Sequence, residues 1–339
     1  MKSTLPILLV AALAAALPLR ADLNSDLAFS AFAGQNIDLN ALAGGQVMQA
    51  RGPIMTFARG ITSQSLFIIN AAPADVAKKL CTWDPASHSE LKVWLHKELP
   101  AQPTLNDFAG LGSVPDNSSV QFQYKALEDF DPEKPSVQVS KEEAQLIAGA
   151  KAQGGDGKAL FAKVWPPILL GRIQSFLSGK GSASEDIGGV HPLNDVKSLL
   201  HSDPKVYGEY QKLLAQTPAK ALATSSGGHM APTNMYCDLF DVEGSAALGT
   251  GAIYQAAFGN SIQSFDVEYF TNYGVYATVE LEQMWPVTVG GRNETLVWRE
   301  DLVSAPNVEY LHGTERMASS MIMLQETKQG VDAFRNEFK

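Results

Sequence analysis

The sequence predicts an α+β protein in which a long C-terminal helix packs over an antiparallel β-sheet. Three observations carry this prediction. Apolar and polar residues alternate between positions 263 and 304, the stretch from 313 to 339 is amphipathic at helical spacing, and a helical block at about 140–217 lies between segments that have the character of strands.

The first elements come after a lead-in at residues 22–60, which is rich in Ala, Gly, Asn and Gln and has no sustained period. We expect it to be loosely structured and to precede one domain at 61–339. A β-rich run at 64–70 predicts a strand, and Pro73 suits the first turn of the helix that follows. Apolar spacing then predicts a helix over 88–99, and period-two alternation predicts a strand over 118–127.

The middle of the chain predicts a helical insertion. Ser140 and Glu143 form the pattern of a capping box at its start. Two further helical stretches, at 157–179 and 194–216, are separated by Gly- and Pro-containing breaks. The insertion is therefore expected at about 140–217, between the two groups of strands.

The run from 263 to 304 predicts successive antiparallel strands joined by short turns. Val279 and Leu281 alternate with Glu280 and Glu282, and the segments TNYG and VGGRN stand where hairpin turns are needed. One face of such a sheet is apolar and needs a cover. We expect the C-terminal helix to supply it.

The apolar side of that helix is rich in methionine. Its stripe consists of Met317, Met321, Leu324, Val331, Phe334 and Phe338. Such a stripe is either ordinary core or the flexible wall of an apolar cavity between the sheet and the helix. In the second interpretation the candidate lining is Met317, Met321, Leu324, Trp298, Trp285, Tyr269 and Tyr276.

Polar groups near the same cavity would be needed for catalysis. The candidates are Arg299, Glu300, Asp301 and Glu315. Consecutive strand residues point to opposite faces, so only some of these side chains are expected to face inward. The sequence has no nucleophile motif and no paired metal-ligand pattern, and it indicates no cofactor.

The N-terminus has the pattern of an export signal. An uncharged apolar run at 5–17 follows Lys2, and Ala21 is a small residue suited to cleavage. Removing residues 1–21 takes away Lys2 and Arg20 and no acid, so 26 basic against 36 acidic residues become 24 against 36, a net charge of −12. This charge excludes nucleic acid as a partner. No later segment has the length and hydropathy of a membrane span, so we expect an exported periplasmic or extracellular protein.

Cys81 and Cys237 are the only cysteines. In an oxidising compartment they are compatible with one disulfide or with two buried thiols, and the sequence leaves both alternatives open.

The order of elements resembles the helix-grip arrangement of the START-like lipid-binding and polyketide-cyclase families. The segment LFIINAAPADVAKKLCTWD is similar to their opening strand and first helix, and residues 234–339 are similar to their sheet and closing helix. The resemblance implies a protein that binds an apolar small molecule or a lipid. An enzyme of cyclase or hydrolase type in the same cavity, or a structural protein without a ligand, remains the alternative.

Overall fold

The computed structural model describes residues 23–179, 186, 189–217 and 230–339. The predicted leader at 1–21 lies outside these residues. The predicted α+β class, with an antiparallel sheet and a long C-terminal helix, is confirmed. No helix in the described ranges is long and apolar enough to cross a membrane.

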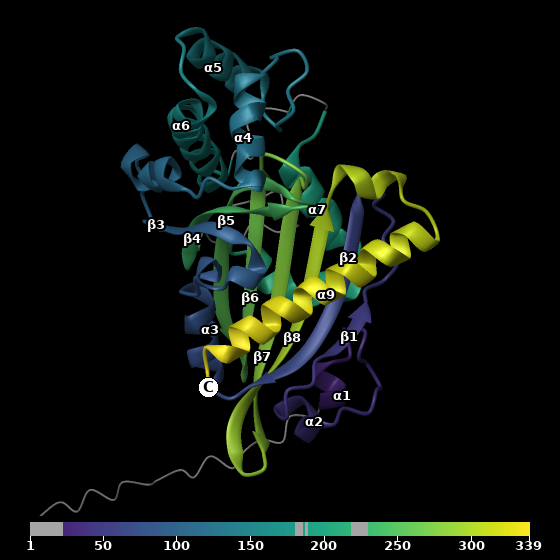
Figure 1. The fold of residues 1–339 in the computed structure, drawn as a ribbon. Coiled ribbons are helices and arrows are strands. Elements are labelled where there is room, and N and C mark those ends of the chain that lie inside the picture. The colour runs from purple at the N-terminus through teal and green to yellow at the C-terminus, as the bar shows by residue number, and fades with distance from the viewer. Residues whose placement is uncertain (1–22, 180–185, 187–188, 218–229) are drawn as a thin grey trace, which may run out of the picture.

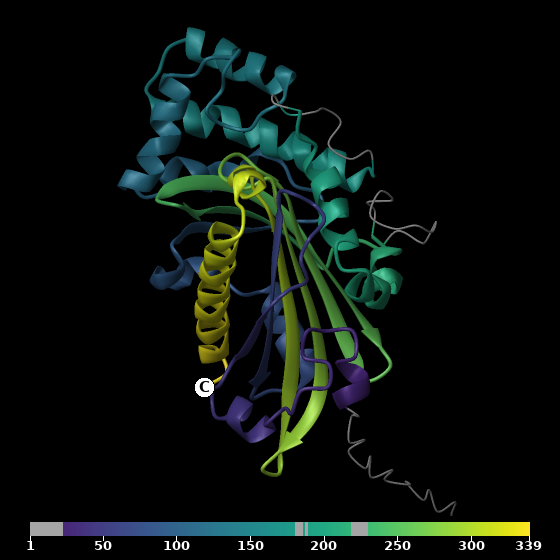
Figure 2. The same cartoon turned by 90° about the vertical axis from the view of Figure 1, so that its right-hand side faces the viewer.

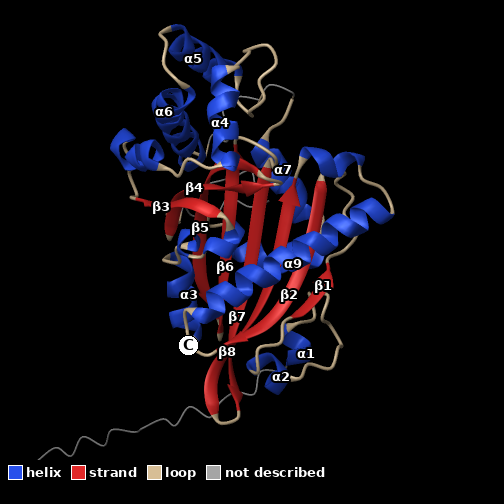
Figure 3. Cartoon of the chain, in the orientation of Figure 1, coloured by secondary structure: helices blue, strands red, loops and turns tan. Residues whose placement is uncertain are grey.

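The sheet has eight strands, and all neighbouring strands are antiparallel (Figure 3). Their order across the sheet is β1-β2-β8-β7-β6-β5-β4-β3. The bounds are Met48–Arg51 for β1, Gly60–Ile69 for β2, Val93–Leu99 for β3, Asn234–Val242 for β4, Ser245–Phe258 for β5, Ser261–Thr271 for β6, Ala277–Val289 for β7 and Arg292–Ser304 for β8. Gly290 and Gly291, both at positive φ, form the predicted turn between β7 and β8.

Nine α-helices of the described residues surround the sheet. Their bounds are Leu23–Asp26 for α1, Leu39–Ala43 for α2, Pro73–Cys81 for α3, Ser118–Glu128 for α4, Lys141–Ala152 for α5, Gly157–Leu177 for α6, Pro192–His201 for α7, Pro204–Leu214 for α8 and Thr314–Asn336 for α9. Helix α9 crosses the front of the sheet in Figure 1. Figure 2 shows α4 to α6 above the end of the sheet, and α7 and α8 on the side of the sheet away from α9.

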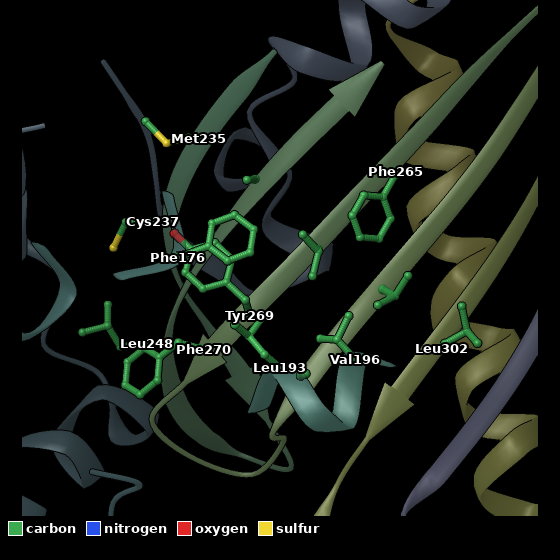
Figure 4. Close-up of a cluster of buried hydrophobic side chains, with 14 of the residues drawn as sticks. Phe176, Leu193, Val196, Met235, Cys237, Leu248, Phe265, Tyr269, Phe270 and Leu302 are labelled. Atoms are coloured by element: carbon green, nitrogen blue, oxygen red, sulfur yellow. The ribbon is translucent and has the colours of Figure 1, made fainter. Parts of the chain in front are cut away.

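The apolar face of the sheet packs against the helical block. Alternate residues of β6 to β8 join α6 to α8 in one continuous buried cluster, part of which is drawn in Figure 4. Within it the rings of Phe176 on α6 and Tyr269 on β6 stack with centroids 3.8 Å apart. The prediction that the C-terminal helix covers the apolar face is therefore wrong. The helical insertion covers that face, and α9 covers the opposite face of the sheet.

Helices α3 and α9 both pack on that second face. At one end of the sheet, Phe67, Val297 and Met284 form a small apolar cluster with Val331 and Phe334 of α9. Towards the middle of α9 the sheet residues on this face become polar. A cavity is found in that part of the interface.

Two segments have the opposite type of secondary structure from the one that the sequence predicted. Residues 88–99, expected as a helix, contain strand β3, which pairs with β4 at the edge of the sheet. Residues 118–127, expected as a strand, lie in helix α4, whose N-terminus is capped by the Asn117 side chain accepting from Val120 N at 3.0 Å. The lead-in at 22–60 carries α1, α2 and β1, so its last part joins the sheet.

Candidate functional site

The candidate site is a cavity of about 380 Å³ between the sheet and α9. Its charged lining consists of six carboxyl groups and one guanidinium: Asp238, Asp241, Glu268, Glu280, Asp301, Glu326 and Arg299. Its apolar lining includes Leu91, Val93, Phe240 and Met323. The acids thus dominate the charge of this cavity.

The strand register places these acids side by side. Asp266 on β6 lies opposite Glu280 on β7, and Glu280 lies opposite Asp301 on β8. Directly opposed residues have Cβ atoms about 5 Å apart, and like charges in such positions repel. All three belong to the face that α9 covers, so the repulsion is not fully screened by solvent.

Arg299 offsets part of this negative charge. Its guanidinium contacts Glu280 and Asp301 at 2.5 Å each, and Glu282 at 3.8 Å. Asp301 also accepts a hydrogen bond of 3.0 Å from Thr327 Oγ1, which joins the site to α9. One guanidinium therefore serves three carboxyl groups on neighbouring strands.

Burial and mutual repulsion favour the protonated form of several acids. Burial, reinforced by Glu280, raises the pKa of Asp266 to about 8. Burial raises the pKa of Glu280 to about 7 although Arg299 opposes the shift, and it holds the pKa of Glu268 well above its usual range. The site therefore contains carboxyl groups that change protonation near neutral pH, as in many functional sites.

Two glycines on β5 make room for the acidic cluster. Gly249 lies opposite Asp238, and Gly251 lies opposite Tyr236 and Glu268. A Cβ atom at Gly249 would overlap the Glu268 carboxylate, and one at Gly251 would overlap the Tyr236 ring. Because neither glycine has a side chain, the Glu268 carboxylate and the Tyr236 ring can lie directly over β5.

A histidine stands at the β3–β4 end of the site. His96 Nδ1 lies 2.7 Å from Asp238 Oδ1, and this hydrogen bond raises the pKa of His96 against the opposing effect of burial. The neighbouring Tyr236 hydroxyl donates to Asp266 Oδ1 at 2.7 Å. Polar partners therefore orient both of these acids.

The predicted aromatic lining lies elsewhere. Trp285 and Tyr269 are buried on the apolar face, against the helical block. Trp298 is buried on the same face, where its Nε1 donates to Gln64. Tyr276 lies beside Arg59. None of these four side chains borders the cavity under α9.

The predicted methionine lining is also displaced. Met317 and Met321 are 44% and 61% exposed, and Met317 borders a different hollow, between α9 and residues 51–62. Leu324 is half-buried, and its carbonyl accepts from Gln49 of β1. Met323, which the predicted stripe omitted, is the methionine of α9 that faces the cavity. The N-terminal half of the stripe was thus misplaced around the helix, whereas Val331 and Phe334 in its C-terminal half pack on the sheet as predicted.

Two of the four predicted polar groups reach the cavity. Arg299 and Asp301 line it, whereas Glu300 between them points to the opposite face, as strand alternation requires. Glu300 Oε1 there accepts from Thr62 and Gln64 at 3.0 and 3.1 Å. Glu315 is exposed at the start of α9.

Sequence reasoning missed the other charged members of the site, namely Asp238, Asp241, Glu268, Glu280 and Glu326. A signal for two of them was present, because Glu268 and Glu280 occupy the polar positions of the period-two strands. That pattern shows which residues share a face, but not that a helix covers it.

The two cysteines are free thiols in different parts of the core. Cys81 ends α3 and clusters with Tyr236 and Ile253, whereas Cys237 belongs to the cluster on the apolar face. Of the two alternatives open from the sequence, the structure has the pair of buried thiols. Burial raises the pKa of Cys81 to about 12, so this thiol is a poor nucleophile.

A larger hollow of about 550 Å³ lies near the end of α6. It is lined mainly by apolar residues, including Leu99, Leu177, Met230 and Met235. It contains no charged lining residue among those described. It can hold an apolar molecule, whereas the cavity under α9 offers several charged groups in one place.

The cavity under α9 suits hydrogen bonding and charge recognition better than metal binding. Within the described ranges, no group of three or more His, Cys, Asp and Glu side chains has the arrangement of a metal site. Comparison of the chain with protein-family models, with curated proteins and with solved structures finds no match. The chemistry of the site therefore rests on its own geometry.

Proposed function

We propose that this protein binds a small molecule carrying a cationic group in the cavity between the sheet and α9. The observation that supports this proposal is the lining of six carboxyl groups and one guanidinium around about 380 Å³. A cation entering there gains charge-assisted hydrogen bonds and relieves the repulsion between neighbouring carboxylates. The acidic lining favours such a ligand over the apolar molecule expected from the sequence.

The resemblance to START-like proteins remains part of the proposal. The long helix across one face of an antiparallel sheet, with a cavity beneath it, supports it. The helical block on the opposite face, α4 to α8, is an addition to that arrangement. Export by the leader at 1–21 is likewise proposed, and it places the binding site outside the cytoplasm.

Titration calorimetry with butylamine tests the proposal. We expect butylamine to bind the wild-type protein and uncharged butanol not to bind. Glu268→Gln is expected to weaken butylamine binding about tenfold or more, because Glu268 is 6% exposed and lines the cavity. Glu133→Gln, which changes an exposed loop acid, serves as the matched control and should leave binding unchanged.

Two outcomes would contradict this function. The first is an absence of binding by any alkylamine at concentrations where the protein stays folded. The second is equal butylamine binding by the wild type and by Glu268→Gln. Uptake of an uncharged apolar ligand that Glu268→Gln leaves unaffected would move the binding site to the hollow near α6.

A further inference from the structure

The hollow between the N-terminal end of α9 and residues 51–62 has a basic and apolar lining. Its volume is about 370 Å³. Arg51 and Arg316 line it, no acidic residue of the described ranges does, and most of its other lining residues are apolar. The chain as a whole carries a formal net charge of −10. The charge at this hollow is therefore opposite in sign to that of the molecule.

Backbone carbonyls hold the Arg316 guanidinium in place. Its Nη1 donates to Ala58 O at 2.9 Å and to Val308 O at 3.3 Å, and its Nη2 donates to Gly60 O. All three acceptors are uncharged, so they orient the guanidinium without neutralising it. The Nε–H group and one N–H of Nη2 have no acceptor among the described residues.

Arg51 is the second uncompensated charge. It is exposed, and its guanidinium has neither a hydrogen-bond acceptor nor a carboxylate partner in the described part of the chain. Glu315, next to Arg316 in the sequence, does not line the hollow. Thr62, which does line it, donates to Glu300 at 3.0 Å. Burial raises the pKa of Glu300 to about 8, so this acid carries a proton at neutral pH and does not offset the two arginines.

Apolar side chains border the same hollow and are open to solvent. Ile54 is 96% exposed and Met317 on α9 is 44% exposed, while the buried Met55 lies between α9 and β2 at the floor. Exposed apolar groups gathered at a hollow are typical of a binding surface. An occupant that uses both kinds of lining needs an anionic group and an apolar part.

We propose that this hollow binds a single-chain alkyl carboxylate of medium length, with its carboxylate at Arg51 and Arg316 and its alkyl chain against Ile54, Met55 and Met317. A guanidinium matches a carboxylate in geometry and forms charge-assisted hydrogen bonds with it. A volume of about 370 Å³ is near the lower end for ligand pockets, which favours one short chain over the two chains of a phospholipid. The inference goes beyond the proposed cation site, because the two cavities share no lining residue.

Titration calorimetry with octanoate at pH 7.5 tests this assignment on the full chain. We expect octanoate to bind the wild type at least about tenfold more tightly than butyrate, because its four additional methylenes leave water. Uncharged octanol should not bind at this hollow. Arg51→Gln should weaken octanoate binding about tenfold, and Arg51→Lys, which keeps the charge but loses the planar fork, should have an intermediate affinity.

A substitution of the apolar lining tests the position of the alkyl chain. Ile54→Ser should reduce the preference for octanoate over butyrate about threefold, and it should leave the fold intact because Ile54 is exposed. Lys158→Gln removes an exposed positive charge from α6, far from the hollow in sequence and outside its lining. As the matched control it should bind octanoate as the wild type does.

Four outcomes would overturn the assignment. They are octanoate binding that Arg51→Gln leaves unchanged, equal affinities for octanoate and butyrate, octanol binding as tight as that of octanoate, and co-sedimentation with phosphatidylglycerol vesicles in the absence of octanoate binding. The last would identify a membrane contact in place of a small-molecule site. Glu268→Gln should leave octanoate binding unchanged, so failure of the cation site and failure of this site are distinguishable.

Discussion

Replacing Arg299 with methionine is expected to lower the free energy of unfolding at pH 8 by about 3 kcal/mol. Removing one partner of a buried ion pair leaves its acids uncompensated and costs about 3 to 5 kcal/mol. We take the lower end because the Arg299 side chain is 16% exposed. Urea unfolding at fixed pH measures the change.

The decrease in the free energy of unfolding caused by Arg299→Met should become smaller as the pH falls to 5. At that pH Glu280, whose pKa lies at about 7, carries a proton and no longer needs the guanidinium. Arg51→Met, at an exposed arginine of the edge strand, is the control and should stay within about 0.5 kcal/mol of the wild type. A loss independent of pH would show that Arg299 acts by packing alone.

The second large effect concerns Glu300 on the opposite face. Burial raises its pKa from 4.5 to about 8. The folded chain therefore holds a proton that the unfolded chain releases above about pH 4.5, so this group's contribution to stability is present below that pH and is lost as the pH rises through about 8. Glu300→Gln stays neutral throughout and should not show the loss.

We expect Glu300→Gln to match the wild type at pH 4.5 and to exceed its free energy of unfolding by about 5 kcal/mol at pH 8.5, from about 1.4 kcal/mol per pKa unit. The difference between the two proteins isolates Glu300 from Asp266 and Glu280, which contribute a slope of the same sign. Glu133→Gln controls for the loss of an exposed acid. A variant less stable than the wild type at both pH values would contradict the account.

The sequence predicted the sheet better than it predicted the helical cover. Alternation in β6 to β8 follows from the pleat of a strand, so it could be recognised without tertiary information. The stripe of α9 could not be placed to within one residue, because its outer methionines have the same spacing as buried ones. Met323 and Thr327 face the sheet, whereas Met317 and Met321 face outward.

The two wrong secondary-structure predictions have separate physical causes. In 88–99, the pairing of β3 with β4 overrides the helical spacing of the apolar residues. His96 and Asp238, whose side chains are hydrogen-bonded, are directly opposite each other in this pairing. In 118–127, the apparent alternation was coincidental. Asn117 in front of two serines is a typical helix cap, and it was the better signal.

The candidate site was half predictable. Arg299 and Asp301 were identified as polar residues near the end of a strand, and both line the cavity. Glu268 and Glu280 occupy polar positions of alternating strands, and such positions usually face solvent in a sheet with one apolar face. Only the placement of α9 over these acids shows that they belong to a cavity, and that placement depends on contacts between residues far apart in the chain.

Carboxyl carbon NMR titration, with and without butylamine, tests the central claim most directly. Glu280→Gln and Asp266→Asn identify the two resonances. We predict that they titrate near pH 7 and pH 8 in the free protein, and that saturating butylamine lowers both midpoints because a bound cation favours the charged carboxylate. Midpoints below pH 5 in the free protein, or midpoints that butylamine leaves unchanged, would contradict a buried acidic site that holds a cation.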